Sequence, residues 1–589
     1  MIPLRELEFA LFEIQRYGAT DEQRETAREI LQTADALARE RFAPYAALAD
    51  RVEPVIVAGR VRLPGAAGEA LRAYTEAGFN AMSFAERDGG LGLPFLLAQT
   101  CSSLFAAANV AFQSYATLTQ GAAHLIAHHG DAAQRERWLP GMLSGKVFGT
   151  MCLSEPHAGS SLADIRTLAT PRDDGRYRLA GRKMWISGGE HELGENIVHL
   201  VLARTPDAPP GVKGISLFLV PRYRDHGVHN GVSLIGLNHK MGWRGTVNTA
   251  LAFGDDAECI GELVGGLHQG LACMFLMMNE ARVGVGLCAV ALGYAAYVQA
   301  LDYARERRQG RALGVRDAAA PQIPIIRHAD VRRMLLAQKC WVEGGLDLVL
   351  HCASLVDQLA ASTDEASREQ RALLLDLLTP VAKSWPAEYC LEANKLAMQV
   401  AGGAGYTRDL PLERLYRDNR LNHIHEGTWG IHGLDLLARK VAMQDGRALA
   451  LWSQAIHADI DAAAQLSARG ANAGLEVHAS ALRTAVTIVL RVTRRLHAIA
   501  AAGEPERAFA NATPYLDAVG TITVAWRWLV RATAAARALD AETPESDFYR
   551  GKIHACRYFF GTDLPRALSQ LEVIERLEDS ALQIDEAGF

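Results

Sequence analysis

A carboxylate in a short, glycine-containing loop is the side chain of this sequence best placed to act as a base. Glu426 is followed by Gly427 and Thr428, and Thr428 is a good N-cap for a helix. Apolar residues then recur at helical spacing, at Ile431, Leu434, Leu437 and Val441. The positive end of that helix would favour ionised Glu426, whereas burial would favour the protonated form. A carboxylate balanced between these effects can be a general base, although a Glu at a helix N-terminus can also have a purely electrostatic role.

Five earlier segments carry residue types that suit a cofactor or an anion. They are residues 151–161 (Met-Cys-Leu-Ser-Glu-Pro-His-Ala-Gly-Ser-Ser), 182–188 (Arg-Lys-Met-Trp-Ile-Ser-Gly), 277–284 (Met-Met-Asn-Glu-Ala-Arg-Val-Gly), 305–311 (Arg-Glu-Arg-Arg-Gln-Gly-Arg) and 399–409 (Gln-Val-Ala-Gly-Gly-Ala-Gly-Tyr-Thr-Arg-Asp). The basic run favours an anion site or a solvated surface, and closely spaced glycines let backbone N–H groups approach a diphosphate. Each segment alone is also consistent with a turn, a core Trp or a helix surface.

Taken together and in this order, the segments resemble the signature segments of the acyl-CoA dehydrogenase family. Glu-Gly-Thr, followed by a helix ending in Ala-Arg-Lys, is similar to the family's catalytic-base loop. Residues 86–94 match another loop of the family and residues 121–124 match a further segment, so the resemblance covers about residues 75–445. It implies that Glu426 removes the α-proton of an acyl-CoA thioester.

The resemblance also implies FAD as the cofactor. Leu153 and Ser154 match the positions that bind the pyrimidine end of the flavin. Trp185 matches the aromatic residue that lies against the ring, and Ser187 matches the hydroxyl near flavin N5. These residue types suit the role, because hydroxyls and N–H groups polarise a flavin and an indole is a flat apolar wall. The full set assigned to FAD by resemblance is Met151, Leu153, Ser154, Gly159, Ser160, Trp185, Ser187, Arg307, Gln309, Gln399, Gly402, Gly403 and Thr428.

Substrate contacts follow from the same comparison. Arg282 matches an Arg near the thioester end of CoA, and its guanidinium can bond carbonyl and phosphate groups. An ordinary helix-surface Arg is the alternative. The positions assigned to acyl-CoA by resemblance are Ser160, Asn279, Arg282 and Gly427.

The implied reaction is α,β-dehydrogenation to a trans-2-enoyl-CoA. The thioester carbonyl would accept hydrogen bonds from the Glu426 backbone N–H and a ribityl hydroxyl, which lowers the pKa of the α-proton. Glu426 would take this proton while hydride leaves the β-carbon for flavin N5, and an electron-transfer flavoprotein would receive the electrons. Family members reach the partner subunit's FAD with the segment matching residues 399–409, so a homodimer is expected.

Two residues beside the base depart from the family pattern. Trp429 stands where smaller residues are usual, and His432 replaces the usual Gln. The Trp429 indole could narrow the acyl channel, or it could face the C-terminal extension or the dimer interface. The histidines at positions 423, 425 and 432 could suggest a metal, but ligation there would fill the space that a thioester requires, so no metal is expected.

The pattern of apolar and β-branched residues along the chain predicts a multidomain α+β protein in four parts. These are an N-terminal helical domain, a central β-barrel-like domain, a helical bundle with the base, and a C-terminal helical extension, at residues 1–146, 147–258, 259–445 and 446–589. The extension resembles a subgroup that includes bacterial broad-chain acyl-CoA dehydrogenases and 3-methylmercaptopropionyl-CoA dehydrogenases.

Composition narrows the functional classes. The 589 residues carry a net charge of −6, which argues against a general nucleic-acid binder. No apolar run is expected to be long enough for a membrane span, and charged residues interrupt the N-terminus where a secretory signal would be apolar. Nine cysteines without Cys-x-x-Cys spacing suggest reduced thiols in the cytoplasm. No strand–Gly-x-Gly-x-x-Gly–helix unit indicates a nicotinamide enzyme.

Two alternatives remain open at this level. An acyl-CoA oxidase would share the base and the flavin but would pass electrons to oxygen. An alkylation-repair flavoprotein would use a C-terminal domain to bind DNA, and Arg491, Arg494 and Arg495 form a small basic cluster there. Nearby acidic residues offset that cluster, and no long basic stripe appears.

Overall fold

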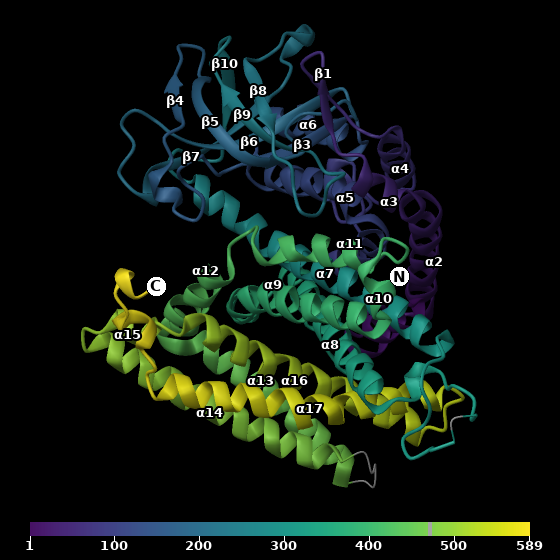
Figure 1. Cartoon of the computed structure of the whole chain (residues 1–589). Helices are drawn as coiled ribbons and strands as arrows, with labels where there is room; N and C mark the ends of the chain where they lie inside the picture. Colours follow the sequence, from purple (N-terminus) through teal and green to yellow (C-terminus); the bar gives the residue numbers. More distant parts are fainter. Residues whose placement is uncertain (318, 469–473) are drawn as a thin grey trace. The chain divides into compact units, whose positions relative to one another are not determined.

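The computed structural model describes residues 1–317, 319–468 and 474–589, with side chains described throughout these ranges except at 275–278 and 468 (Figure 1). The chain divides into two compact units, one formed by residues 30–281 and the other by residues 1–29 together with 282–589. Each unit has its own packed interior, and each is described by itself.

The helices of the first unit precede its β-domain in the chain. After the end of α2 (Asp21–Leu37) they are α3 (Ala46–Arg51), α4 (Gly65–Glu76), α5 (Phe95–His129) and α6 (Ala132–Leu143). A capping box starts α6, because the Asp131 carboxylate accepts from the Gln134 N–H and the Gln134 side chain accepts from the Asp131 N–H. The apolar sides of α5 and α6 pack on the β-domain.

The β-domain is a sheet that closes on itself. Its strands are β3 (Val147–Cys152), β4 (Leu168–Pro171), β5 (Tyr177–Ser187), β6 (Asn196–Arg204), β7 (Ile215–Pro221), β8 (Val232–Leu237), β9 (Asn248–Phe253) and β10 (Cys259–Val264), besides a separate hairpin of β1 (Val55–Val57) and β2 (Arg60–Arg62). The order is β10-β7-β6-β4-β5-β9-β8, with β3 parallel to β6, and an additional β10–β5 pairing closes a barrel-like ring.

Strand β6 shows why this sheet has two cores. Its side chains alternate, as they do in any strand, and both of its faces are buried. Val198, Leu200 and Leu202 pack with α5 and α6, whereas Val201 and Ala203 lie in the interior of the ring. Burial on both faces explains the continuous apolar run in the sequence.

The second unit is almost entirely helical. It contains α1 (Leu4–Glu8), most of α7 (Gly270–Glu306), α8 (Ala329–Ala360), α9 (Glu365–Ala401), α10 (Gly403–Tyr406), α11 (Leu412–Asn419), α12 (Trp429–Leu434), α13 (Met443–Ala468), α14 (Leu475–Ala501), α15 (Pro505–Phe509), α16 (Ala512–Asp540), α17 (Ser546–Glu575) and α18 (Ser580–Gln583). Helix α16 packs on α8, α9, α13 and α17, so the C-terminal helices and the bundle share one interior.

The expectation that no segment is long and apolar enough to span a membrane is wrong. Two helices, Phe95–His129 and Gly270–Glu306, are long and apolar enough to cross a membrane by length and composition, with mean hydropathies of 1.5 and 1.6. Most of each apolar stretch is buried inside the protein in the part of the chain that the structure describes. Burial in the protein interior therefore accounts for the apolar composition of these two helices.

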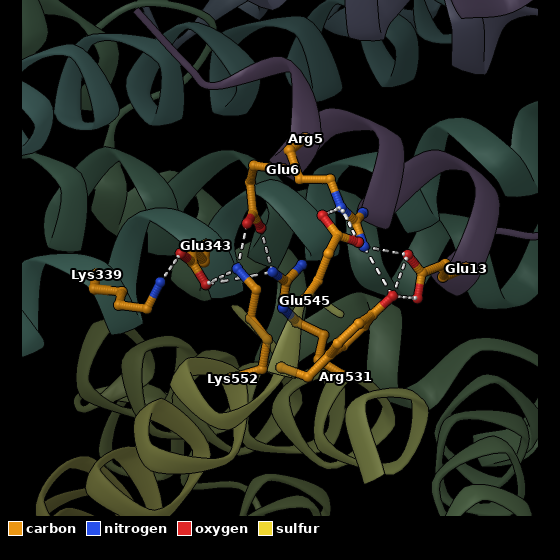
Figure 2. A network of polar contacts seen from close by, with 9 residues as sticks. Arg5, Glu6, Glu13, Lys339, Glu343, Arg531, Glu545 and Lys552 are labelled. Carbon is orange, nitrogen blue, oxygen red and sulfur yellow. Dashed lines mark hydrogen bonds and ion pairs between the residues drawn. The ribbon is translucent and has the colours of Figure 1, made fainter. Parts of the chain in front are cut away.

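A buried network of charges anchors the N-terminus to the C-terminal helices (Figure 2). Glu6 of α1 pairs with Arg531 of α16 and Lys552 of α17. Lys552 Nζ lies 2.8 Å from Glu343 Oε2 of α8, and Arg531 Nη2 lies 3.4 Å from the same oxygen. All four side chains are almost inaccessible to solvent, so each charge depends on its partners for stabilisation.

We expect Glu343→Gln to destabilise this unit by about 3–5 kcal/mol, because Lys339 loses the carboxylate with which it pairs and Glu6 alone is left to pair with the buried Arg531 and Lys552. Burial alone would raise the pKa of Glu343, but Lys339, Lys552 and Arg531 lower it to about 2. A lowered carboxyl pKa stabilises the fold above the unfolded value of about 4.3, and this contribution is lost as the pH falls towards 2. Thermal unfolding between pH 7 and pH 3 measures both effects.

The matched control is Glu365→Gln, because Glu365 pairs with Arg368 on the exposed surface of α9. This variant should unfold like the wild type. If Glu343→Gln is as stable as this control, or has the wild-type acid dependence, the network does not stabilise the unit as argued.

Candidate active site

The Glu426 loop has an unusual backbone conformation. Glu426 has φ +54° and Gly427 has φ +98°, so two consecutive residues lie in the left-handed region. For a Glu this conformation costs on the order of 1 kcal/mol or more, and such strain is common at functional sites. A Cβ at position 427 would lie 2.6 Å from His432 Nε2, so glycine is required there for space as well as for φ.

Two buried side chains hold the carbonyl groups of this loop. Lys383 Nζ donates to the Gly427 carbonyl oxygen at 2.8 Å. His432 Nε2 lies 3.0 Å from the Glu426 carbonyl oxygen, which can only accept, so Nε2 carries the proton. Both side chains are completely buried, which fixes the direction of two successive peptide groups.

Close contact between two helices brings positive charge to the loop. A Cβ at Gly286 of α7 would lie 2.0 Å from the Ala382 carbonyl oxygen of α9, so glycine allows these helices to touch. Arg282 stands one turn before Gly286, and Lys383 directly follows Ala382. Arg282 Nη1 lies 3.5 Å from Asp435 Oδ2.

The electrostatics of the loop favour a carboxylate of increased basicity. Glu426 keeps partial solvent exposure, yet desolvation by the surrounding protein raises the pKa of its carboxyl group, against the opposing effect of Arg282 and Lys383. Burial also lowers the pKa of Lys383 to about 7, against the attraction of Glu426. For His432, burial lowers the pKa to about 3, so the imidazole is neutral at pH 7.

The predicted flavin residues of the β-domain lie on two adjoining segments. Met151 lies next to the last residue of β3, Leu153 and Ser154 follow the strand, and the Met184 N–H donates to the Ser154 carbonyl at 3.0 Å. Between Lys183 and Ile186 the pairing of β5 with β9 is irregular. A bulge of this kind redirects side chains.

Trp185 lies within that bulge. It has φ +65°, and 63% of its surface is exposed, so the strand presents a flat indole face instead of burying it. Two residues further on, the Ser187 hydroxyl accepts from Asn248 Nδ2 at 3.0 Å. An exposed indole beside hydroxyl groups is a surface that fits an aromatic cofactor.

An ion pair that the sequence did not reveal supports the Leu153–Ser154 segment. Lys183 Nζ donates to the Leu153 carbonyl at 3.0 Å and to Glu155 Oε1 at 2.9 Å, and both side chains are buried. Glu155 also accepts from the backbone N–H groups of Arg166 and Thr167 and from the Thr167 hydroxyl. A Lys-Met-Trp run gives no sign that its lysine is buried.

The other predicted residues are placed as follows. In the first unit, Gly159 and Ser160 are exposed in the loop after Glu155, and Asn279 lies on α7. In the second unit, the exposed residues of the predicted set are Arg307, Gln309, Gln399, Gly402, Gly403 and Thr428. Met277 and Met278 of the Arg282 segment lie outside the described side chains.

The two units thus each gather part of the predicted set. Glu426, Gly427 and Arg282 lie together in the second unit, with His432 beside the base as the sequence indicated and Lys383 as an unpredicted neighbour. The first unit contains the segments around Ser154 and Trp185, with Lys183 and Asn248 as their unpredicted supports.

The helix after the base differs from its predicted form. Thr428 occupies the N-cap position, but its side chain forms no capping hydrogen bond. Leu437 and Val441 are buried as expected, whereas Ile431 and Leu434 are 38% and 46% exposed, so the predicted continuous apolar face is wrong. A π-helical turn at Asp435–Arg439 and a 3₁₀ turn at Lys440–Ala442 change the helical period, which rotates the two halves relative to each other.

Trp429 lies against His423, and the basic cluster of the C-terminal helices contains an ion pair. The Trp429 ring centroid lies 4.5 Å from that of His423, and α12 packs on α16 of the C-terminal helices. In the basic cluster, Arg491 forms an ion pair with Glu575 at 2.8 Å.

No group of three or more His, Cys, Asp or Glu side chains is arranged for a metal within the described residues.

Comparison with known proteins gives matches along nearly the whole chain. Residues 24–146, 150–255 and 268–441 match the models described as acyl-CoA dehydrogenase N-terminal, middle and C-terminal domains. Residues 452–585 match the model described as acetyl-CoA dehydrogenase C-terminal like.

Full-length relatives are similar in sequence and in fold. The chain is 34% identical to 3-methylmercaptopropionyl-CoA dehydrogenase of Ruegeria pomeroyi, over 95% of each chain. It is 33% identical to the broad-specificity linear acyl-CoA dehydrogenase FadE5 of Mycobacterium tuberculosis, over 96% of this chain and 94% of that one. A solved acyl-CoA dehydrogenase from Bacillus anthracis, complexed with FAD, superposes with a TM-score of 0.73 at 19% identity, over 96% and 89% of the two chains.

Proposed function

The chain belongs to the acyl-CoA dehydrogenase family and is an FAD-dependent oxidoreductase of acyl-CoA thioesters, for which we propose Glu426 as the catalytic base. The observation that carries the assignment of the base is its setting. Glu426 lies in a loop of fixed, strained backbone, where desolvation raises the pKa of its carboxyl group. A carboxylate of increased basicity is suited to removing an activated α-proton.

The β-domain residues fit the flavin by their chemistry. We assign the ring surface to the exposed indole of Trp185, with hydrogen bonds from the Leu153–Ser154 segment and the Ser187 hydroxyl. A bound FAD would supply the acceptor for the hydride that leaves the β-carbon. By the same resemblance, Arg307 and Gln309 would contact an FAD diphosphate, and Gln399, Gly402 and Gly403 would reach the FAD of a partner subunit; a Cβ at either glycine would meet no atom within 4 Å.

Glu426 and its neighbours would then perform the proton transfer. The Glu426 backbone N–H polarises the thioester carbonyl, which makes the α-proton acidic, and the carboxylate accepts that proton. The substrate loses one proton and one hydride, which leaves a trans-2-enoyl-CoA. Arg282 and Lys383 provide positive charge on the carboxylate side of the loop, which favours its ionised form before the transfer.

We further propose an electron-transfer flavoprotein as acceptor, a homodimer and a cytoplasmic location. Tyr406, next to the Gly402–Gly403 turn, is 84% exposed, which suits a segment that meets a second subunit. All nine cysteines are free thiols, in keeping with a reducing compartment. The two relatives compared above are dehydrogenases, which gives the oxidase and alkylation-repair alternatives no support.

Anaerobic titration of the purified holoenzyme with a panel of acyl-CoA thioesters tests the activity. We expect the flavin absorbance to bleach with at least one chain class, because the substrate passes its hydride to FAD. Slow reoxidation in air, with fast reoxidation by an electron-transfer flavoprotein, would support the acceptor. Flavin that stays oxidised with every thioester would contradict the activity, and rapid reoxidation by oxygen would favour an oxidase.

A further inference from the structure

Among the residues that the structure describes, Lys383 is a buried lysine that forms no ion pair with a carboxylate. It lies in the fully buried stretch 377–387 of α9, and its side chain has no exposed surface. No carboxylate forms an ion pair with it among the residues that the structure describes. Its hydrogen bond goes to the Gly427 carbonyl at 2.8 Å.

A charge in this position is costly for folding. Removing an ammonium group from water costs several kcal/mol unless partners compensate for it, and a single carbonyl compensates only in part. A methionine of similar length would fill the same space without that cost. The attraction that opposes this cost comes from the Glu426 carboxylate, and with a pKa of about 7 the ammonium group is mostly charged below pH 7.

The geometry of the loop shows how Lys383 acts on the base. A peptide group is planar and trans, so its C=O and N–H point in opposite directions. Lys383 on the Gly427 carbonyl and His432 on the Glu426 carbonyl therefore also set the directions of the Thr428 and Gly427 N–H groups. These two contacts keep the loop in its left-handed conformation against its intrinsic preference.

We propose that Lys383 is a positioning residue of the dehydrogenation site, which holds the base loop through the Gly427 carbonyl and supplies the charge that keeps Glu426 ionised. This inference rests on the assignment of Glu426 as the base. The hydrogen bond of Lys383 goes to a backbone carbonyl and not to a reacting atom. Lys383 acts through Glu426 and through the backbone of the loop.

The other groups around Lys383 do not replace this charge. Arg282 of α7 is engaged with Asp435, and its positive charge repels the ammonium group. Burial lowers the pKa values of His423 and His425 to about 4 and that of His432 to about 3. The histidines are therefore neutral above about pH 5, and Lys383 and Arg282 supply the positive charge that acts on Glu426.

Lys383→Met tests the role of the charge. We expect the purified variant to retain FAD, and the rate of flavin bleaching in anaerobic stopped-flow experiments to fall by about 10- to 100-fold at pH 7. The acid limb of the pH–rate profile should move upwards by about one pH unit or more, because a carboxylate that loses a neighbouring cation becomes harder to ionise. Lys383→Arg keeps a cation and should restore the acid limb to near its wild-type position, whatever its maximal rate.

The control is Lys395→Met, because Lys395 lies on the exposed side of the same helix and pairs with Glu392. It should have the wild-type rate and profile. An unchanged acid limb in Lys383→Met would overturn the proposal, as would equal upward shifts in the Met and Arg variants. If Lys383→Met does not fold, Lys383→Arg becomes the deciding variant. An upward shift of its acid limb would then overturn the proposal. Full activity of Glu426→Gln would instead reject the base assignment, so the two failures are distinguishable.

Discussion

Glu426→Gln is expected to lower the rate of flavin bleaching by acyl-CoA by roughly 10²–10⁴-fold, which is the usual contribution of a general base. The amide has almost the same shape as the carboxylate but does not accept a proton at neutral pH. Lys383 and His432 hold carbonyl groups of the backbone, so the loop conformation does not depend on the side-chain charge. FAD content and acyl-CoA binding should therefore remain close to those of the wild type.

The same substitution should leave the protein at least as stable as before. Burial raises the pKa of Glu426, so the folded state binds this proton more tightly than the unfolded state does. For a raised carboxyl pKa, the stabilising contribution is present at low pH and is lost as the pH rises through the folded value. Ionised Glu426 thus destabilises the fold at pH 7, and Gln removes that cost.

Stopped-flow bleaching and thermal unfolding at pH 7 measure the two effects together. Glu392→Gln is the matched control, because Glu392 lies on exposed α9 surface and pairs with Lys395. It should bleach at the wild-type rate. If Glu426 is the base, Glu426→Gln should bleach slowly while its thermal stability is unchanged or increased. Near-normal bleaching in Glu426→Gln would reject the assignment, and slow bleaching with lower stability would indicate a structural defect.

The sequence predicted the order of helical and β segments because these depend on local periodicity. It also singled out Glu426, by its place in a glycine-containing loop before a helix, and both Glu426 and Trp185 by the resemblance of their segments to the acyl-CoA dehydrogenase family. The structure adds that both have positive φ, at +54° and +65°. A positive φ at a residue other than glycine is imposed by tertiary contacts, so no local pattern in the sequence indicates it.

The supporting lysines could not be predicted for a related reason. Lys183 and Lys383 stand in ordinary sequence contexts, and lysine is rarely buried. Their partners are distant in sequence: Lys183 is 28 residues from Glu155, and Lys383 is 44 residues from Gly427. The apolar face after Thr428 was predicted wrongly because the helical period changes at Asp435, which the positions of apolar residues do not reveal.

Lys183→Met is expected to destabilise the β-domain by about 3–5 kcal/mol, because it leaves the buried Glu155 carboxylate without its counter-charge. It also releases the Leu153 carbonyl, which Lys183 holds at 3.0 Å. Since we assign the Leu153–Ser154 segment to the flavin, the variant should also lose FAD. Thermal unfolding and the ratio of flavin to protein absorbance after purification measure these effects.

Arg182→Met is the matched control on the neighbouring position. Arg182 pairs with Asp255 at 2.9 Å on the exposed side of the strand, where an ion pair contributes about 0–1 kcal/mol. This variant should retain FAD and unfold close to the wild-type temperature. Equal behaviour of the two variants would mean that the Lys183–Glu155 pair supports neither the fold nor the flavin segment.

The double variant Lys183→Met with Glu155→Leu separates the two roles of the pair. Replacing both charges with apolar groups removes the unpaired carboxylate, so part of the lost stability should return. The Leu153 carbonyl would still lack its donor, and the backbone N–H groups of Arg166 and Thr167 would lose their acceptor. FAD affinity should therefore stay low although the domain is folded. Recovery of FAD affinity together with stability would show that the pair only maintains the fold.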